Sequence, residues 1–304
     1  MDIYLPIAGL SVNAILILML GAAVGILSGM FGVGGGFLTT PLLIFFGIPP
    51  TVAAASAATQ VTGASISGML AHLRRGGVDI QMGIILVCGG IFGAVAGAGL
   101  FTLLQRAGQI DTVIGLLYVT LLGSIGTLMA RDAWASLRPK DGAAPRAGKG
   151  RHHHPLVAAL PLRWRFYRSG LFISPLAPAI LGFISGVLTV LLGVGGGFIM
   201  VPAMIYLLGM PARVVVGTSL FQILFVTAAT TLVHALTTQA VDIVLATILL
   251  LGGVTGAQLG AKLATKLPAD VLRMLLAIIV LAVALRLALG LGWQPSDIYS
   301  IETT

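Results

Sequence analysis

The chain has 304 residues, of which 58% are hydrophobic and 9% are charged, and its mean hydropathy is +1.07. Soluble domains are roughly 45–50% apolar and about 25% charged, so this composition excludes a soluble globular protein and indicates a membrane protein. The net charge of +8 does not indicate a nucleic-acid partner, because nine of the seventeen Lys and Arg residues lie in one segment, residues 131–168.

Eight apolar runs follow one another, each near the ~20 residues that a membrane-spanning helix needs. They cover residues 10–27, 52–73, 80–104, 112–129, 171–192, 214–236, 243–263 and 271–291. Two shorter apolar pieces, residues 37–47 and 198–208, each follow a glycine run. The N-terminus has no basic n-region, so we expect no cleavable signal peptide. The single cysteine, Cys88, excludes an internal disulfide, and its place in an apolar run predicts a packed core thiol.

Residues 131–170 are rich in glycine, proline and basic residues, which predicts a flexible linker. We therefore divide the chain into a first transmembrane repeat (1–130), this basic linker (131–170), a second transmembrane repeat (171–292) and a C-terminal tail (293–304). The linker ends in RWRFYRSG, a mixture of arginines and aromatic residues that is typical of a membrane interface. His152, His153 and His154 have no carboxylate or thiolate partners nearby, so we expect adventitious metal affinity, and neither a metal site nor a cofactor.

The two halves of the chain repeat one another. The segment GVGGGF occurs at residues 32–37 and 193–198, and GGIFGAVAG from residue 89 shares its glycine spacing with GGVTGAQLG from residue 252. Further matched pairs are Gly25 and Gly186, Pro41 and Pro202, Ser56 and Thr218, Gln60 and Gln222, His72 and His234, and Asp79 and Asp242. We interpret the chain as an internal duplication of one membrane unit.

The distribution of Lys and Arg predicts how the two copies cross the bilayer. If each half crosses five times, with the short apolar piece as one crossing, the linker, Arg74, Arg75 and most other basic residues fall on the cytoplasmic side. If each short piece is a re-entrant loop, each half crosses four times and more basic residues face outward. The first arrangement obeys the positive-inside rule better. It predicts an all-α polytopic membrane protein of two inverted repeats, each of about five transmembrane segments, with extracytoplasmic termini and a cytoplasmic linker.

The glycine runs predict a broken helix in each repeat. An eleven-residue helix covers about 16 Å and five extended residues add about 16 Å more, which together just cross the ~30 Å hydrocarbon core. Unwound backbone beside a helix N-terminus presents free N–H groups and the positive end of the helix dipole, which suits an anion. Two inverted copies would bring two such ends toward a central axis. Alternatively, the glycines only allow close helix packing.

Neutral polar side chains follow the glycine runs. One helical face of the third segment carries Ser56, Gln60, Gly63 and Ser67, and its counterpart carries Thr218 and Gln222. All nine Asp and Glu residues lie at segment ends, in loops or in tails, so a cation substrate is not expected. Amide donors suit a polar anion, although each glutamine could equally form a buried interhelical hydrogen bond.

Two matched pairs stand near the ends of apolar runs. His72 and His234 could titrate near neutral pH and couple transport to protons, or they could cap their helices or lie in the membrane interface. Asp79 and Asp242 are expected at helix N-termini, where a carboxylate complements the helix dipole.

These motifs resemble a known family. The segments SGMFGVGGGFLTTPLL and TVLLGVGGGFIMVPAM, each followed by a segment beginning near AAASAATQ or VVVGTSLFQ, resemble the TauE/SafE permeases, also called the sulfite and organosulfonate exporter family. The resemblance implies a prokaryotic inner-membrane secondary transporter for a small anion such as sulfite, sulfoacetate or a related sulfonate or carboxylate. Val201 in place of Thr40 suggests that the two half-sites are not chemically equal. The predicted substrate contacts are Ser28, Gly34, Gly35, Gly36, Phe37, Thr39, Ser56, Gln60, Thr189, Gly195, Gly196, Gly197, Phe198, Thr218 and Gln222.

The sequence is compatible with several transport mechanisms. An inside-negative potential expels an anion at about 2.3 kcal/mol per charge per 100 mV, so we expect export by alternating access, with an anion channel or a proton-coupled importer as alternatives. An intramembrane enzyme would need a nucleophile with its base, or metal ligands, and the apolar runs supply neither. The expected partners are a small anion and the lipid bilayer, and the sequence carries no signal for the oligomeric state.

Overall fold

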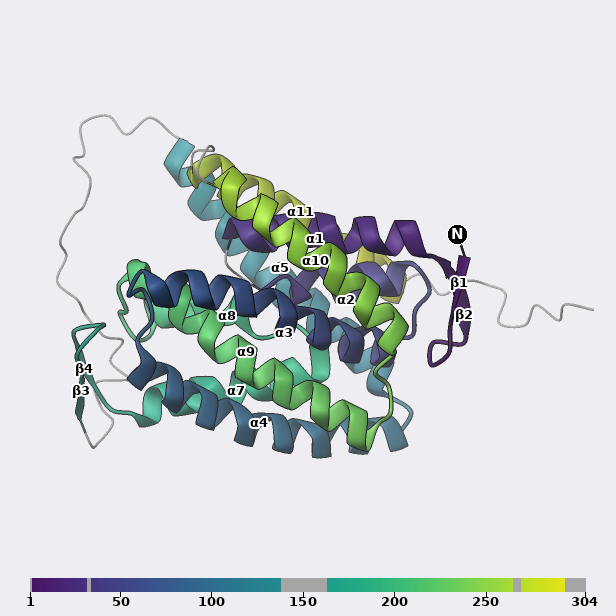
Figure 1. Ribbon diagram of the computed structural model, residues 1–304, viewed down its shortest axis with the longest axis horizontal. Helices are drawn as coiled ribbons and strands as arrows, with labels where there is room; N and C mark the ends of the chain where they lie inside the picture. The colour runs from purple at the N-terminus through teal and green to yellow at the C-terminus, as the bar shows by residue number, and fades with distance from the viewer. Residues whose placement is uncertain (1, 32–33, 138–162, 265–268, 293–304) are drawn as a thin grey trace, which may run out of the picture.

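The computed structural model describes residues 2–31, 34–137, 163–264 and 269–292, which form ten helices and two hairpins (Figure 1). The predicted helical membrane fold is confirmed. The first half consists of β1 (Asp2–Leu5), β2 (Leu10–Asn13), α1 (Ala14–Phe31), α2 (Gly36–Phe45), α3 (Pro50–Arg74), α4 (Ile80–Arg106) and α5 (Ile110–Leu137). The second half repeats this order with β3 (Trp164–Phe166), β4 (Leu171–Ile173), α7 (Leu176–Leu192), α8 (Gly197–Tyr206), α9 (Ala212–Thr237), α10 (Ile243–Ala264) and α11 (Ala269–Gly292).

The two hairpins differ from the sequence-based expectation, which treats residues 10–27 and 171–192 as uniform helical runs. β1 pairs antiparallel with β2, and β3 with β4. Gly9 and Gly170 have φ of 70° and 66°, and their N–H groups donate to the carbonyls of Leu5 and Phe166 at 2.9 and 2.8 Å. Glycine adopts this backbone without a Cβ clash. The β3–β4 hairpin therefore extends the second repeat upstream of residue 171.

The helices pair across the two halves in a pattern that is unchanged when the halves are exchanged. α1 packs on α10 and its counterpart α7 packs on α4, while α3 packs on α9 and α5 on α11. The β1–β2 and β3–β4 hairpins lie at opposite ends of the bundle (Figure 1). We interpret this arrangement as two inverted repeats whose helices interlock, so that neither half buries its own apolar surface alone.

Glycines bring the backbones of these paired helices into contact. A Cβ added to Gly29 of α1 would lie 2.1 Å from the carbonyl oxygen of Ala257 in α10, and one added to Gly186 of α7 would lie 2.0 Å from that of Gly90 in α4. Small residues permit such approach in membrane helices, where packing replaces the hydrophobic effect as the main attraction. The glycines of the segments GGIFGAVAG and GGVTGAQLG thus serve close helix packing.

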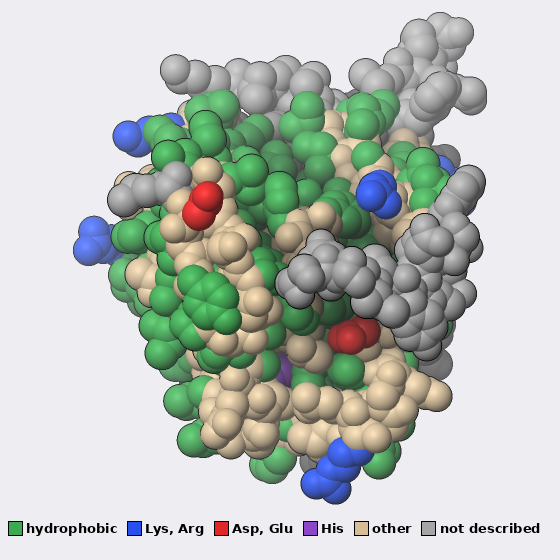
Figure 2. All heavy atoms as spheres, turned by 90° about the vertical axis from the view of Figure 1, so that its right-hand side faces the viewer, with side chains coloured by type: hydrophobic (Ala, Val, Ile, Leu, Met, Phe, Trp, Pro, Cys, Tyr) green, Lys and Arg blue, Asp and Glu red, His purple; other side chains and the backbone are tan. Residues whose placement is uncertain are grey.

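The outer surface of the bundle suits a lipid environment. Among the described residues, four helical stretches are long and apolar enough to cross a membrane: Ile80–Arg106, Ile110–Arg131, Val214–Thr237 and Ile243–Gly260. Shorter apolar helices accompany them. Figure 2 views the end of the bundle that carries β1 and β2. Along the helices between the two ends, large hydrophobic side chains such as Phe92, Val95 and Leu251 are exposed. The protein is therefore a multi-pass membrane protein.

Cys88 corrects one sequence-based expectation. Its thiol is exposed at the protein surface and is not packed in the core. It shares the outer face of α4 with Ile84, Ile91, Phe92 and Val95, all of which are exposed. An apolar run does not distinguish a residue that faces protein from one that faces lipid, which explains why the prediction was wrong.

The short helices return the chain to the end of the bundle from which it came. α1 begins directly after β2. α3 begins beside the same hairpin, because Asp242 contacts both of them. Its carboxylate accepts the N–H of Ile7 in the β1–β2 turn, and its own N–H donates to Ser56 of α3. The chain between α1 and α3, which includes α2, must therefore lead back along the bundle. The second half shows the same relation. This course favours five passes in each half over four passes with a re-entrant loop.

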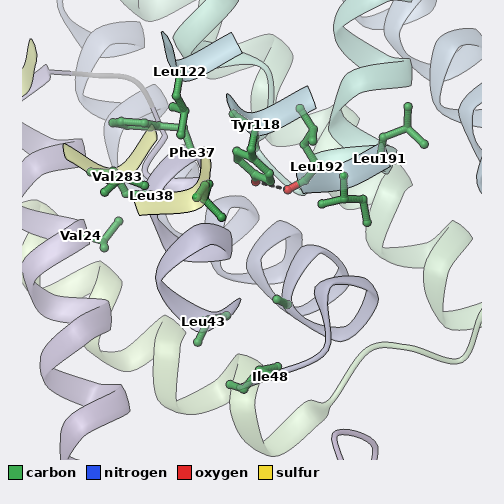
Figure 3. Close-up of a cluster of buried hydrophobic side chains, with 14 of the residues drawn as sticks. Val24, Phe37, Leu38, Leu43, Ile48, Tyr118, Leu122, Leu191, Leu192 and Val283 are labelled. Carbon is green, nitrogen blue, oxygen red and sulfur yellow. Dashed lines mark hydrogen bonds between the residues drawn. The ribbon is translucent and has the colours of Figure 1, made fainter. Parts of the chain in front are cut away.

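The largest buried cluster surrounds α2 and the end of α7 (Figure 3). Phe37, Leu38 and Tyr118 are fully buried there. The Tyr118 hydroxyl and the Thr40 hydroxyl, the latter at 3.1 Å, both donate to the carbonyl of Leu192 at the end of α7. The first half thus supplies the donors that a helix C-terminus lacks, which fixes the position of the second glycine run.

Candidate substrate site at the two helix breaks

The glycine runs form two equivalent interruptions, here called the first break (residues 34–35) and the second break (residues 193–196). Gly34 and Gly35 have φ of 86° and 72°, and Gly195 and Gly196 both have 72°. These values favour glycine, so the runs end one helix and start the next. The first helical hydrogen bonds run from the N–H of Leu38 to the carbonyl of Gly35 and from the N–H of Ile199 to the carbonyl of Gly196, both at 3.1 Å. The N–H groups of Phe37 and Phe198 precede them and belong to the unpaired first turn of a helix.

The two breaks meet at the centre of the bundle. A Cβ added to Gly36 would lie 2.6 Å from the carbonyl oxygen of Gly193. Added to Gly34 or Gly195, it would contact both Val61 of α3 and Ile223 of α9. The rings of Phe37 and Phe198, the second residues of α2 and α8, are stacked with centroids 4.6 Å apart and 6° between their planes. The predicted convergence of two helix N-termini is therefore present in the structure.

In the first half, the polar side chains beside the break bond to each other. The Thr39 hydroxyl donates to Oε1 of Gln60 at 2.8 Å, and both residues are buried. The hydroxymethyl group of Ser28 lies against Gly35, because a Cβ added there would be 3.1 Å from the Ser28 Cβ. Ser28, Gly35, Thr39 and Gln60 thus form one connected group, and their contact with a substrate stays a prediction.

In the second half, the polar group beside the break includes Ser185, which the sequence analysis did not predict as a site residue. Nε2 of Gln222 donates to Oγ of Ser185 at 3.2 Å, and this Oγ would lie 1.9 Å from a Cβ on Gly196. The predicted residue Thr189 donates its hydroxyl to the Ser185 carbonyl at 2.7 Å. Ser185 immediately precedes Gly186 and matches Val24, so the comparison of repeats gave no signal for it. Its place one helical turn before Thr189 was the signal available.

Ser56 and Thr218 contact the starts of α10 and α4 of the opposite half. Their hydroxyl oxygens accept the backbone N–H groups of Asp242 and Asp79, at 3.2 and 2.9 Å. Each aspartate belongs to the opposite half, so the two contacts join the halves at both ends of the bundle. These hydrogen bonds give Ser56 and Thr218 a structural role, while their predicted contact with substrate stays a prediction.

The predicted positions of Asp79 and Asp242 at helix starts are confirmed. Asp79 accepts the N–H of Met82 at 3.1 Å, and Asp242 accepts the N–H of Leu245 at 3.1 Å. Each also binds the hairpin of the opposite half, through the N–H of Ser169 and of Ile7 respectively, both at 3.0 Å. Both carboxylates are buried. They are therefore caps that join the repeats, a role that the helix-dipole argument did not include.

The two histidines lie far from each other. His72 packs on Gly217 near the start of α9, whereas His234 is in the last turn of the same helix. Nε2 of His234 lies 2.9 Å from the carbonyl oxygen of Val190, and Nδ1 lies 3.1 Å from the Thr238 hydroxyl. His234 therefore links the ends of α7 and α9, which matches the capping alternative. Proton coupling through either histidine stays a prediction.

The described residues contain no group of three or more His, Cys, Asp or Glu side chains that could hold a metal ion. The three histidines of the linker, His152 to His154, lie outside the described residues. What the breaks offer is a buried pair of helix N-termini with neutral hydroxyl and amide groups around them. Such a site can hold an anion through backbone N–H groups without any cationic side chain.

Comparison with known proteins assigns the chain to a family. The profile described as "Sulfite exporter TauE/SafE" matches residues 17–287. The chain is similar to a "Probable membrane transporter protein" of Xylella fastidiosa strain Temecula1, with 29% identity over 79% of this chain and 80% of that protein. It is similar to the "Probable membrane transporter protein YjnA" of Bacillus subtilis, with 29% identity over 79% of this chain and 86% of the relative.

A shorter match, 32% identical over 36% of this chain and 25% of the relative, is to the "Sulfite exporter TauE/SafE family protein 2" of Arabidopsis thaliana. No solved structure matches the chain. The family and the names of its relatives point to a membrane transporter rather than an enzyme. With the profile spanning both helix breaks and nearly every described helix, the chain belongs to the TauE/SafE family of membrane transporters.

Proposed function

We propose that the protein is a secondary transporter that exports a small organosulfur anion or sulfur oxyanion, such as sulfite, sulfoacetate or a related sulfonate or carboxylate. The observation that carries the proposal is the meeting of the two breaks, with the N-termini of α2 and α8 joined by the Phe37–Phe198 stack. The word "sulfite" in the family's description supports the substrate class. Alternating access would then be a movement of the two repeats about this central point.

Charge at the centre favours an anion. Among the described residues, the buried acidic side chains are Asp79 and Asp242. Both accept backbone N–H groups at helix starts and at the hairpins, so neither is free to bind a cation. Oxyanions accept several hydrogen bonds, which the N–H groups of a helix N-terminus can supply.

The proposed orientation places the β3–β4 end of the bundle in the cytoplasm of a bacterium and both chain termini outside the inner membrane. Arg168 of the β3–β4 turn donates to the carbonyl of Gly76 at 2.7 Å. This contact puts Arg168 beside Arg74 and Arg75, which follow one another at the end of α3. Basic residues collect on the cytoplasmic side, and an inside-negative potential then drives an anion outward.

A ligand screen tests the proposal. Purified protein in detergent is heated with millimolar sulfite, thiosulfate, sulfate, sulfoacetate, taurine or small dicarboxylates at pH 6 and pH 8. A ligand of the folded state stabilises it by RT ln(1 + [L]/Kd), about 2.7 kcal/mol at one hundred times Kd. We expect one of the sulfur anions to raise the melting temperature. A response to cations or neutral solutes alone would refute the anion site.

A pair of variants locates the response. Gly35→Leu or Gly196→Leu should remove the ligand-induced shift, because the side chain would fill the break. Gly108 has a similar φ of 67° and no heavy atom within 4 Å of an added Cβ, so Gly108→Leu is a matched control with the same backbone strain but should keep the shift.

Saturable flux in proteoliposomes would separate a transporter from a channel, and flux that follows an imposed pH gradient would indicate proton coupling.

A further inference from the structure

The two matched glutamines present opposite hydrogen-bonding groups to their surroundings. In the first half, Oε1 of Gln60 accepts the Thr39 hydroxyl at 2.8 Å. In the second half, Nε2 of Gln222 donates to Ser185 at 3.2 Å, and Oε1 of Gln222 is buried without a hydrogen-bond partner among the described residues. A buried amide oxygen without a donor is unfavourable. Such a group in a transport site suggests a partner that arrives with the substrate.

The sequence explains why this oxygen has no donor among the described residues. Position 39 of the first half is matched by position 200 of the second, because the two GVGGGF runs align and the residues follow two places later. The first half has a threonine there and the second half has Met200. A thioether cannot donate a hydrogen bond. The second half therefore lacks the hydroxyl that satisfies the glutamine of the first half.

The side chain that carries this oxygen belongs to the group around the second break. Gln222 binds Ser185, and Oγ of Ser185 lies within 1.9 Å of the place that a Cβ on Gly196 would occupy. Gly196 in turn is the N-cap of α8. One ligand could thus place its anionic group at the N-terminus of a short helix and another group at Gln222.

We propose that Oε1 of Gln222 accepts a hydrogen bond from a hydroxyl group of the substrate, so that the transported anion is a hydroxyalkylsulfonate or a similar hydroxylated small anion. This inference rests on the proposed function and narrows its substrate class. A hydroxyl is favoured over an ammonium group. A buried cation needs a carboxylate partner, and the buried carboxylates of the described residues, Asp79 and Asp242, are already bound to backbone N–H groups.

The test compares two anions that differ by one hydroxyl, 2-hydroxyethanesulfonate and ethanesulfonate, in thermal-shift titrations of the full-length protein in detergent. The wild type should bind the hydroxylated anion about tenfold or more tightly, since a site that hydrogen-bonds a hydroxyl discriminates against the analogue without it. Sulfite and sulfate are titrated in parallel to establish that the anion site itself is occupied.

Variants at position 200 make the test specific. Met200→Thr should provide an internal donor for Gln222 and so raise the melting temperature of the ligand-free protein relative to Met200→Val. It should also abolish the preference for the hydroxylated anion, so that the two sulfonates bind with about equal affinity. Met200→Val has the shape of threonine without its hydroxyl and should keep the preference. Gln222→Met, which removes the acceptor, should lose the preference without any change at position 200.

The outcomes separate the two proposals. Equal binding of the two sulfonates by the wild type, or an unchanged preference in Met200→Thr and Gln222→Met, overturns the role of Gln222 and leaves the anion transporter standing. Failure of both sulfonates and of sulfite and sulfate to bind overturns the proposed function itself, and this inference falls with it.

Discussion

The two halves of the chain share a backbone at the central site but differ in the side chains around it. Both breaks have glycines at φ of 72°, followed by a ten-residue helix with a buried phenylalanine at its second position. Around this frame, Thr39 and Thr40 are matched by Met200 and Val201, and Val24 is matched by Ser185. A symmetric frame therefore carries an asymmetric set of polar groups, which fits the proposed binding of a substrate whose two ends differ.

The interface between α3 and α9 shows the same contrast. Toward one end, Thr62 donates to Thr227 at 2.8 Å, and the hydroxyls of Thr59 and Thr231 lie 3.3 Å apart. Toward the other end, Leu220 packs with Val61 and Ile223 in an apolar cluster that Met69 and Val216 cover. Because the two helices are counterparts, the difference arises from side chains alone. The repeat thus conserves helix positions and varies the polarity along them.

The largest expected effect concerns a feature that both halves share. Asp79→Ala and Asp242→Ala should each destabilise the protein by about 2–4 kcal/mol. Each removes a helix cap and leaves an N–H group of the opposite hairpin without an acceptor, buried at Ser169 and part-buried at Ile7. Thermal unfolding in detergent would compare them with Asp111→Ala, which removes an exposed carboxylate from the first turn of α5. A loss confined to one of the two buried sites would contradict the symmetric role.

A smaller effect should distinguish the two breaks. Gly35→Ala and Gly196→Ala both place a Cβ at φ of 72°, which costs about 1–2 kcal/mol. At Gly35 the nearest atom is the Cβ of Ser28 at 3.1 Å, but at Gly196 it is Oγ of Ser185 at 1.9 Å. Ser185 would have to rotate away from Gln222, at a further cost of about 1 kcal/mol. Gly196→Ala should therefore be the more destabilising change in thermal unfolding.

A double-mutant cycle checks the cause of that difference. Ser185→Ala introduced into Gly196→Ala should recover part of the loss, since it removes the clashing oxygen. The same change introduced into Gly35→Ala should recover nothing, because Ser185 belongs to the other break. Equal losses for the two alanine variants, or equal effects of Ser185→Ala in both backgrounds, would show that the clash is not the source.

Much of this architecture could be predicted from the sequence because the governing patterns are local or repeated. Apolar runs of membrane length predicted the helices, and the matched glycine runs predicted two breaks that meet. The hairpins could not be predicted, since strands of three or four residues at the edge of an apolar run have no distinct periodicity. Ser185 was missed because Val24 occupies its matched position, and repetition reveals only what the two halves share.

Other features depend on three-dimensional neighbours that one sequence does not display. The exposure of Cys88 depends on which face of α4 meets lipid. The burial of Asp79 and Asp242 depends on hairpins of the opposite half, which lie 90 and 235 positions away at Ser169 and Ile7. From the sequence alone, carboxylates at the ends of apolar runs are expected at the protein surface, whereas in the structure the hairpins bury them.

The smallest expected effect compares Thr227 with its counterpart Ser65. The Thr227 hydroxyl accepts from Thr62 at 2.8 Å and donates to the Ile223 carbonyl at 2.8 Å, whereas the Ser65 hydroxyl is buried without a hydrogen-bond partner among the described residues. Thr227→Val should cost about 0.5–1.5 kcal/mol, and Ser65→Ala should cost nothing or stabilise by up to about 1 kcal/mol, because it removes an unsatisfied polar group. Thermal unfolding of the two variants measures both. If Ser65→Ala destabilised the protein as much as Thr227→Val, the hydroxyl of Ser65 would have a hydrogen-bond partner and the contrast between the two counterparts would be wrong.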